Sequence, residues 1–509
     1  MKLKSNYKNL IVEIVCYLFV LLFVYAAVSK FLDFENFQVQ IGQSPLISAF
    51  ALWVTPGVLI LELSTAFLLI ISKYRMLGLY ASLFLMSLFT AYIFIVIHYS
   101  SFVPCSCGGI LEKMSWNTHL VFNLIFIALA ITAIFMQCKT ISKITGNRYI
   151  VNAIKIASCM VFSTVVIISL FLYSEKIMHY ENPFIRRYPQ HPAMFEKQVD
   201  LEYNSYYLAG MAKGRIYLGN YTAPLRIKSM DSNLDDIKIN KIIYKSINIP
   251  FQAPTVAVDD SYFYLKDGSV PVILRGSSAN WKINHELKGI PYFTQAIPTD
   301  STSIIFRSNY GKNLANVLGV YKEENHPKIK YDNALLQQQI DGVFDTDGIL
   351  LYSKKLKSQV YVYFYRNEFI IAHNSGELIR RSHTIDTVSK AKIKVSYLNH
   401  NSQRKMSAPP LIVNANAAVC GNLLFVNSKI KGKFEDNKLW EQASIIDVYD
   451  LTKNSYLMSF AIYNIGEHKL RAFFVTENKL YAMIGSQLAV YQLRTILKKE
   501  FRSESLKED

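Results

Sequence analysis

The sequence has little of what disulfide-stapled or nucleic-acid-binding proteins need. It contains only 6 cysteines in 509 residues, which is too few for a fold held together by disulfides. The formal net charge of +17 would suit nucleic acid, but the lysines are scattered and no basic block or nucleic-acid motif occurs. We therefore expect no nucleic-acid partner. The positive charge could instead meet anionic lipid, a cell-wall polymer or an acidic protein.

The second half of the sequence also lacks a recognisable catalytic or metal-binding constellation. Its dispersed histidines show no metal-ligand spacing; they are His285, His326, His373, His383, His400 and His468. Aspartates near turns, such as Asp260, Asp345 and Asp447, are typical of local backbone hydrogen bonding, which we favour over calcium binding. Cys420 is interpreted as a lone buried thiol. We expect no metal centre in this half.

What the sequence does have is a set of apolar stretches of membrane-spanning length. A bilayer core of about 30 Å needs about 20 apolar residues per helix. Five such stretches run approximately over residues 10–28, 50–71, 77–97, 119–135 and 151–173. The first follows three lysines and so resembles a signal peptide. Four more spans follow it, however, and no good cleavage site is present, which predicts an uncleaved helix.

Positive charges fall mainly on one side of these spans. Lysines and arginines concentrate before the first span, between the second and third, and between the fourth and fifth. Loops rich in Lys and Arg stay in the cytoplasm, so we predict a cytoplasmic N-terminus. With an odd number of spans, everything after Tyr173 is then extracytoplasmic. The loop between the third and fourth spans lies on that same outer side.

This outer loop carries the closest cysteine pair of the chain, Cys105 and Cys107. Two cysteines separated by one residue can close a small, strained ring, and strained disulfides are easily reduced. The two glycines that follow would let a partner's sulfur approach closely. We favour a thiol–disulfide exchange pair. The second interpretation is an inert disulfide that pins the loop, and the third is a metal site completed by His98 and His119.

Three segments of this half resemble the MauE/DoxX-like membrane family. They are residues 25–34 (YAAVSKFLDF), Pro56-Gly57 with Glu62 in the second span, and residues 104–109 (PCSCGG) before the fourth span. The resemblance covers about the first third of the chain. It implies a helical-bundle protein of the bacterial inner membrane, linked in methylamine utilisation to maturing a disulfide-rich periplasmic dehydrogenase subunit. The large C-terminal domain departs from the short family members.

Glu62 lies near the middle of the second span, where an ionisable side chain is costly and marks a candidate functional site. It could relay a proton released by thiol oxidation or help to bind a quinone-like acceptor, although no cofactor is otherwise evident. The plainer interpretation is a neutral carboxyl group that hydrogen-bonds Ser64 or Thr65. At the outer end of the first span, Lys30 and Asp33 are expected to reach water or to pair at the membrane surface.

The remainder of the chain is polar and rich in strand signals. We divide the chain into a helical bundle (1–175), a linker (176–203), an all-β domain (204–495) and a polar tail (496–509). Six turn-plus-strand signatures recur in the all-β domain. They begin at Gly214, Asp260, Ser301, Asp347, Gly421 and Asn478. Intervals of about 40 to 50 residues between the first four are typical of propeller blades. The prediction is a six-bladed β-propeller, with seven blades as the alternative.

The function predicted from these features is an inner-membrane accessory for thiol–disulfide exchange or maturation of an extracytoplasmic client. Cys105 and Cys107 would exchange, Glu62 would assist, and the propeller would bind the client or thiol partner. The enzyme class would be a thiol–disulfide oxidoreductase. The alternative is a non-enzymatic membrane anchor whose propeller binds a protein or surface polymer. A transporter is disfavoured because paired intramembrane acids and an inverted repeat are not evident.

Overall fold

The computed structural model describes two compact units. The described residues are 2–44, 47–98, 115–141, 147–177, 184–244, 249–311, 314–398, 403–406 and 408–501. One unit comprises residues 1–190 together with 432–435, and the other comprises 191–431 and 436–509. Cys105 and Cys107 lie outside the described residues, so the predictions made for them are not tested by the fold.

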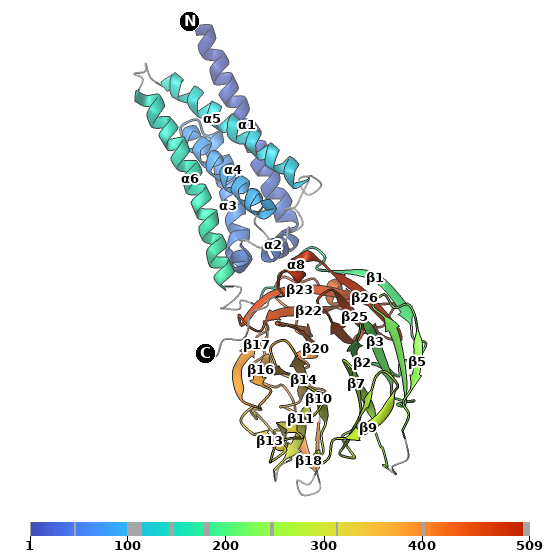
Figure 1. Ribbon diagram of the computed structural model, residues 1–509. Helices are drawn as coiled ribbons and strands as arrows, with labels where there is room; N and C mark the ends of the chain where they lie inside the picture. Colours follow the sequence, from blue (N-terminus) through green and yellow to red (C-terminus); the bar gives the residue numbers. More distant parts are fainter. Residues whose placement is uncertain are drawn as a thin grey trace. The chain divides into compact units, whose positions relative to one another are not determined.

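The first unit is a bundle of long apolar helices (Figure 1). Its elements are α1 (Lys2–Leu32), α2 (Phe34–Gln43), η1 (Ser48–Phe50), α3 (Ala51–Ile70), α4 (Arg75–His98), α5 (Trp116–Ile141) and α6 (Asn147–Lys176). Five of them are long and apolar enough to cross a membrane, namely α1, α3, α4, α5 and α6. This confirms the predicted number of spans. The sequence analysis did not predict α2, because ten residues of mixed polarity are too short to span a bilayer.

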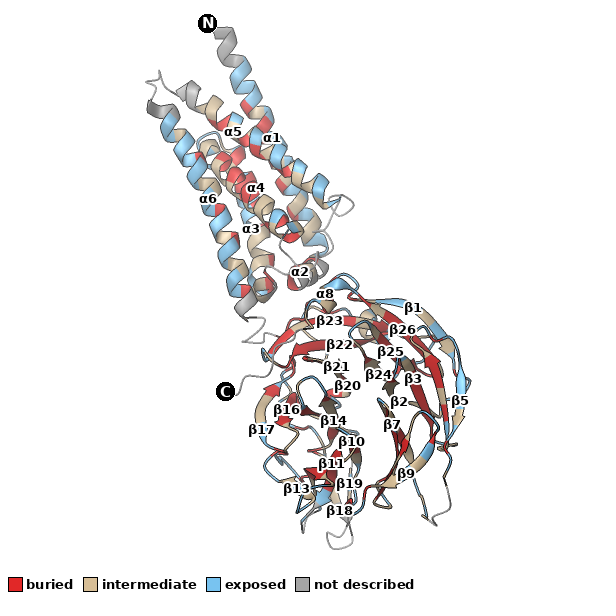
Figure 2. Ribbon diagram, in the orientation of Figure 1, coloured by how far each residue is buried: buried red, intermediate tan, exposed pale blue. Residues whose placement is uncertain are grey.

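The bundle packs a core and leaves apolar side chains on its outside. Phe19, Leu79, Leu83 and Ile134 are among the side chains that form this core and are fully buried. Figure 2 shows long exposed stretches on α1 and α6. Many of these exposed residues are large and apolar, such as Leu172. Such surfaces are costly in water and suit lipid.

The second unit is a six-bladed β-propeller, as predicted (Figure 1). Each blade is a four-stranded antiparallel sheet, in the orders β2-β3-β4-β5, β6-β7-β8-β9, β10-β11-β12-β13, β14-β15-β16-β17, β20-β21-β22-β23 and β24-β25-β26-β1. The strands of the first three blades are β2 (Tyr206–Ala212), β3 (Arg215–Asn220), β4 (Arg226–Asp231), β5 (Lys238–Lys241), β6 (Thr255–Asp259), β7 (Tyr262–Asp267), β8 (Val272–Ser277), β9 (Lys282–Glu286), β10 (Gln295–Pro298), β11 (Ser303–Tyr310), β12 (Ala315–Lys322) and β13 (Ile329–Asp332). Those of the last three are β14 (Gly348–Ser353), β15 (Ser358–Tyr363), β16 (Glu368–His373), β17 (Leu378–His383), β20 (Asn414–Cys420), β21 (Leu423–Ser428), β22 (Ala443–Asp450), β23 (Ser455–Tyr463), β24 (Leu470–Val475), β25 (Lys479–Ile484), β26 (Gln487–Leu493) and β1 (Ala193–Asp200).

Three further elements lie outside the blades. They are the hairpin of β18 (Val395–Leu398) with β19 (Gln403–Met406) and the short helices α7 (Asn437–Gln442) and α8 (Thr495–Lys498). The hairpin lies in the chain between β17 of the fourth blade and β20 of the fifth.

The ring closes through the first strand of the unit. β1 pairs antiparallel with β26, from Ala193 opposite Leu493 to Asp200 opposite Gln487. The sequence analysis placed these residues in a linker, whereas residues 193–200 form the outer strand of the last blade. The strand was missed because it lies at a sheet edge. Most of its side chains are exposed, so its sequence lacks the strong apolar alternation of an inner strand.

Five of the six strand signatures fall on the second strand of a blade, β3, β7, β11, β21 and β25. This strand lies between two neighbours and is largely buried, so its apolar pattern is strong. The signature at Asp347 instead precedes β14, the first strand of its blade. That shift, together with the β18–β19 hairpin, makes the following interval wider than the others.

Candidate functional site

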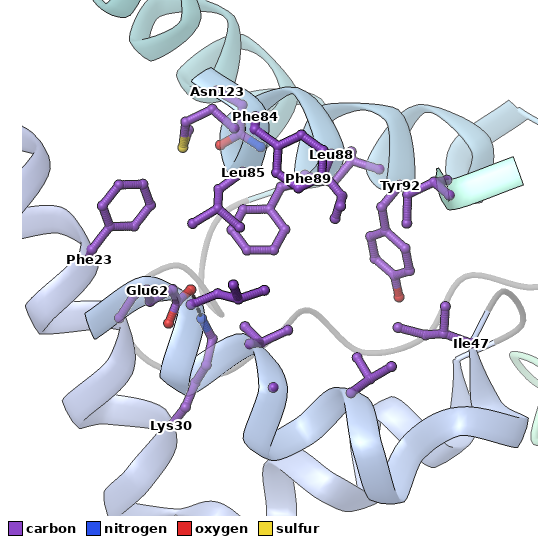
Figure 3. A pocket seen from close by; sticks show the side chains of 18 of the residues that line it. Phe23, Lys30, Ile47, Glu62, Phe84, Leu85, Leu88, Phe89, Tyr92 and Asn123 are labelled. Atoms are coloured by element: carbon purple, nitrogen blue, oxygen red, sulfur yellow. Dashed lines mark hydrogen bonds and ion pairs between the residues drawn. The ribbon is translucent and has the colours of Figure 1, made fainter. Parts of the chain in front are cut away.

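The helical unit encloses a cavity of about 410 Å³ (Figure 3). Helices α1 to α6 all contribute to its walls. The walls are mainly aromatic and aliphatic, with Phe23, Phe89 and Tyr92 among the aromatic side chains. Largely apolar cavities of this size, with a few convergent polar groups, are typical of small-molecule sites.

The sequence of α3 explains why one of its faces meets the cavity. Its lining residues are Val54, Gly57, Val58, Leu61 and Glu62. They recur at intervals of three and four residues and therefore lie on one side of the helix. Glu62 thus points inward, away from the outer face of α3, and its side chain is 1% exposed.

Glu62 forms an ion pair with Lys30 of α1 inside the cavity. Figure 3 shows the two side chains pointing toward one another from different helices. The Lys30 ammonium also lies 5.6 Å from the ring centre of Phe37 and 5.8 Å from that of Phe89. The pair accounts for the presence of a buried acid, because a paired charge is far less costly than an isolated one.

This pairing differs from what the sequence analysis expected of either residue. Lys30 was expected at the membrane surface, near water or Asp33, and the hydrogen-bond partners expected for Glu62 were Ser64 or Thr65. The structure instead joins Lys30 to Glu62, 32 residues further along the chain. Both residues belong to segments that carry the MauE/DoxX-like resemblance. Tyr25 and Gly57 of the same segments also line the cavity.

Two buried polar atoms at the cavity have no hydrogen-bond partner among the described residues. They are Oε2 of Glu62 and Nδ2 of Asn123 on α5. Asn123 is only 2% exposed. Sequence reasoning missed Asn123, although a lone amide within an apolar span is a signal that could have marked it.

Further polar groups of the cavity come from α4 and α5. Tyr92 lines it, and its hydroxyl lies 2.8 Å from the Ser44 hydroxyl, with both groups buried. Trp116 and His119 line it from the first turn of α5. These groups give the cavity hydrogen-bonding capacity beyond the Lys30–Glu62 pair.

Among the described residues, no group of three or more His, Cys, Asp or Glu is placed to hold a metal ion. The proposed zinc ligands His98 and His119 can be located, but Cys105 and Cys107 lie outside those residues. The rings of His98 and Phe94 stack with their centres 4.4 Å apart. His98 is not among the cavity-lining residues.

Three further cysteines, Cys16, Cys159 and Cys420, are free thiols. Cys16 is buried in the bundle core, and Cys159 lies 3.8 Å from the backbone oxygen of Tyr80. Cys420 lies in the propeller, where burial, aided by the charge of Glu477, raises its pKa to about 12. A thiol with so high a pKa is a poor nucleophile at neutral pH.

The aspartates that were expected near turns differ in setting, since Asp345 lies in the turn before β14 whereas Asp447 lies within β22. The Asp345 carboxylate accepts hydrogen bonds from the N–H groups of Ile340, Asp341 and Gly342, at 3.2, 3.0 and 2.6 Å. Asp447 accepts a hydrogen bond from Ser459 within its blade. These contacts match turn and sheet chemistry rather than a calcium site.

Comparison with known proteins separates the two halves of the chain. Residues 8–136 match the family model described as "Methylamine utilisation protein MauE". No curated protein sequence gives a significant match. Solved structures similar to the propeller include a member of the DUF4221 family from Bacteroides vulgatus, with 12% identity, TM-score 0.38, and coverage of 59% of this chain and 97% of that one.

Two further solved structures are similar over the same half. BamB from Moraxella catarrhalis has 9% identity, TM-score 0.33, and coverage of 59% of this chain and 99% of that one. An inactive virginiamycin B lyase from Staphylococcus aureus with quinupristin has 10% identity, TM-score 0.35, and coverage of 58% and 99%. The six blades are established by the strand pairing of this chain itself.

Proposed function

We propose that this protein is a MauE-like membrane accessory for thiol–disulfide exchange with an extracytoplasmic client. The supporting observation is that a MauE match over residues 8–136 coincides with a bundle whose Lys30, Gly57 and Glu62 meet at one cavity. In this proposal the bundle lies in the bacterial inner membrane with its N-terminus in the cytoplasm. The propeller is then periplasmic, on the same side as Cys105 and Cys107.

The proposed reaction is disulfide exchange at Cys105 and Cys107. A client thiolate attacks the Cys105–Cys107 disulfide and forms a mixed disulfide, releasing one thiolate of the pair. A second client thiolate then attacks the mixed disulfide. The client leaves with a new disulfide, and Cys105 and Cys107 are left as two thiols. The two electrons gained by the pair must pass to a separate acceptor before the next cycle.

The propeller is proposed to hold the client during this exchange. Its core strands are fully paired within six blades, so its loops and outer edges remain for binding. Its thiol, Cys420, is partly buried and has a raised pKa, so it is a poor candidate for exchange. This assigns the chemistry to the membrane unit and recognition to the propeller.

The competing function is a non-enzymatic anchor or receptor. The six fully paired blades are compatible with it, because they leave loops and outer edges to bind a partner. In that case the two cysteines would be structural. Replacing both would then lower stability at most and leave partner binding unchanged.

Client trapping distinguishes the two functions. A Cys107→Ser variant retains the Cys105 thiol. Its thiolate can attack a disulfide of the oxidised client, releasing one client thiolate, and the mixed disulfide should accumulate because Cys107 is absent to displace it. That adduct should be released by a reductant and should be absent from the Cys105→Ser/Cys107→Ser variant. Cys420→Ser, added to the Cys107→Ser variant, is the matched control and should leave the trapping unchanged. Failure of the single-cysteine variant to form any reductant-sensitive adduct, where a known exchange protein does form one, would reject the exchange function.

A further inference from the structure

The cavity of the helical unit suits a lipid-soluble ligand. It is about 410 Å³ in volume and its lining is mostly apolar. Flat rings are well accommodated by aromatic walls, which here include Phe23, Phe89 and Tyr92 (Figure 3). An apolar chain can lie along the aliphatic part of the lining.

The charges in the cavity favour a neutral ligand. Lys30 and Glu62 form an ion pair, so their charges cancel. A fatty acid or phospholipid head group would bring a second negative charge close to Glu62 in a medium of low dielectric constant. Like charges repel strongly there. A neutral head group avoids this cost.

The two unpartnered atoms define the hydrogen bonds that such a head group should make. Nδ2 of Asn123 is a donor and Oε2 of Glu62 is an acceptor, and both are buried. Buried polar atoms without partners are costly, so a ligand that satisfies both would be held firmly. A ring that carries carbonyl oxygens when oxidised and hydroxyl groups when reduced has this capacity. A carbonyl of the oxidised ring accepts from Asn123 only. In the reduced ring, one hydroxyl oxygen accepts from Asn123 and the other hydroxyl donates to Glu62, so the reduced form satisfies both atoms.

We propose that the cavity binds an isoprenoid quinone. Its head group would lie between Asn123 of α5 and the Lys30–Glu62 pair of α1 and α3, with its chain along the apolar walls. A role as electron acceptor rests on the proposed thiol exchange. Oxidation of two thiols to a disulfide releases two electrons and two protons, and the quinone takes up both pairs to become a quinol. Glu62 is positioned to pass one of these protons.

Gly57 offers a way to fill the cavity without removing a charged or polar group. It lines the cavity, and a Cβ atom added there meets no atom within 4 Å. Gly57→Phe should therefore place a ring in the ligand space. Ile60→Phe is the matched control, since it adds a ring to the exposed outer face of the same helix.

The test measures binding of a short-chain ubiquinone and a short-chain menaquinone to the purified full-length protein in nanodiscs. Quenching of tryptophan fluorescence reports binding, because Trp116 lines the cavity. Gly57→Phe should weaken binding at least about 10-fold, and Ile60→Phe should leave it unchanged. Asn123→Leu should weaken it by about 2- to 10-fold, as expected for one lost hydrogen bond.

Equal affinities for the wild-type and Gly57→Phe proteins would overturn the proposal. So would a wild-type protein that binds neither quinone and yields only phospholipid or fatty acid on extraction. Should Gly57→Phe not fold, Asn123→Leu decides the matter. Quinone binding by Cys105→Ser/Cys107→Ser should equal that of the wild type. Intact binding without client trapping would therefore reject the exchange function and leave the cavity assignment standing.

Discussion

At the scale of single residues, the Lys30–Glu62 pair carries most of the functional argument. Its two members come from different spans and meet inside an apolar cavity. Burying both charges costs desolvation energy that their mutual attraction only partly offsets. The pair is present despite this cost, and the Asn123 amide beside it has no hydrogen-bond partner for Nδ2. Both features suit a binding or proton-transfer role better than a purely structural one.

A double-mutant cycle tests how the two charges depend on each other. Glu62→Leu leaves the Lys30 ammonium without its partner, and we expect it to lower the free energy of unfolding by about 3–5 kcal/mol. Lys30→Met/Glu62→Leu removes both charges and should cost clearly less than the single change. Thermal unfolding in detergent, monitored by size-exclusion chromatography, measures the stability of both variants. Lys30→Met completes the cycle, and a double variant whose loss of stability equals the sum of the two single losses would show that the charges are not coupled.

A second residue-scale prediction concerns Lys266 of the propeller. Burial lowers its pKa from 10.5 to about 8. Below pH 8 both the folded and unfolded states are protonated at this site. Between pH 8 and 10.5 only the unfolded state retains the proton, so stability should rise with pH across this window. The rise, relative to Lys266→Met, should reach at most about 3 to 4 kcal/mol, since the pKa falls by about 2.5 units and one unit is about 1.4 kcal/mol.

Urea unfolding, monitored by the circular dichroism of the β-strands at pH values from 7 to 10.5, measures the free energy of unfolding of the wild type and of Lys266→Met. Lys282→Met, on the exposed surface of the same blade, is the control and should follow the wild type. Parallel pH profiles for the wild type and Lys266→Met would contradict the prediction.

At the scale of elements, apolar runs and strand signatures were sufficient to predict the architecture. The five spans follow from length and hydropathy, which a bilayer imposes directly. The second strands of five blades follow from burial between two neighbours. The helix α2 and the edge strand β1 were missed, because neither has a long or alternating apolar pattern.

The cavity could not be predicted in the same way. The intramembrane position of Glu62 marked it as a candidate, since charge in a span is rare. Its partner Lys30 and the amide of Asn123 reach the same space only through the packing of α1, α3 and α5. Sequence spacing within one helix places residues on a face, but it does not say which faces of different helices meet.

The next prediction concerns β26, the strand that pairs with the ring-closing strand β1. Val490 lies in the middle of β26, opposite Lys197 of β1 and Tyr481 of β25, and it is fully buried. Val490→Pro removes a backbone donor from a strand paired on both sides, and should lower propeller stability by about 3 kcal/mol or more. Chemical unfolding followed by circular dichroism measures the loss.

Lys197→Ala, at the register partner in β1, is the control for this change. Its side chain is exposed and pairs with the exposed Asp235 at 2.5 Å. Loss of such a surface pair should cost no more than about 1 kcal/mol. If the two variants were equally stable, β26 would not be the strand that secures the ring.

At the scale of the whole molecule, the account assigns separate tasks to the two units. The helical unit supplies a cavity with an ion pair, and the proposed exchange cysteines lie in the segment between α4 and α5. The propeller has six fully paired blades, and we propose that it recognises the client. Such a division requires Cys105 and Cys107 to cycle between disulfide and dithiol in the folded protein.

The redox state of Cys105 and Cys107 in the folded protein therefore decides between an exchange pair and a structural disulfide. Differential alkylation of the two thiols in intact membranes, across a graded redox buffer, gives the reduction potential of the pair. The account predicts reversible titration at a potential above about −250 mV, in the range of exchange-competent disulfides. A disulfide that resists reduction until the protein unfolds would contradict it and would identify the pair as a structural link.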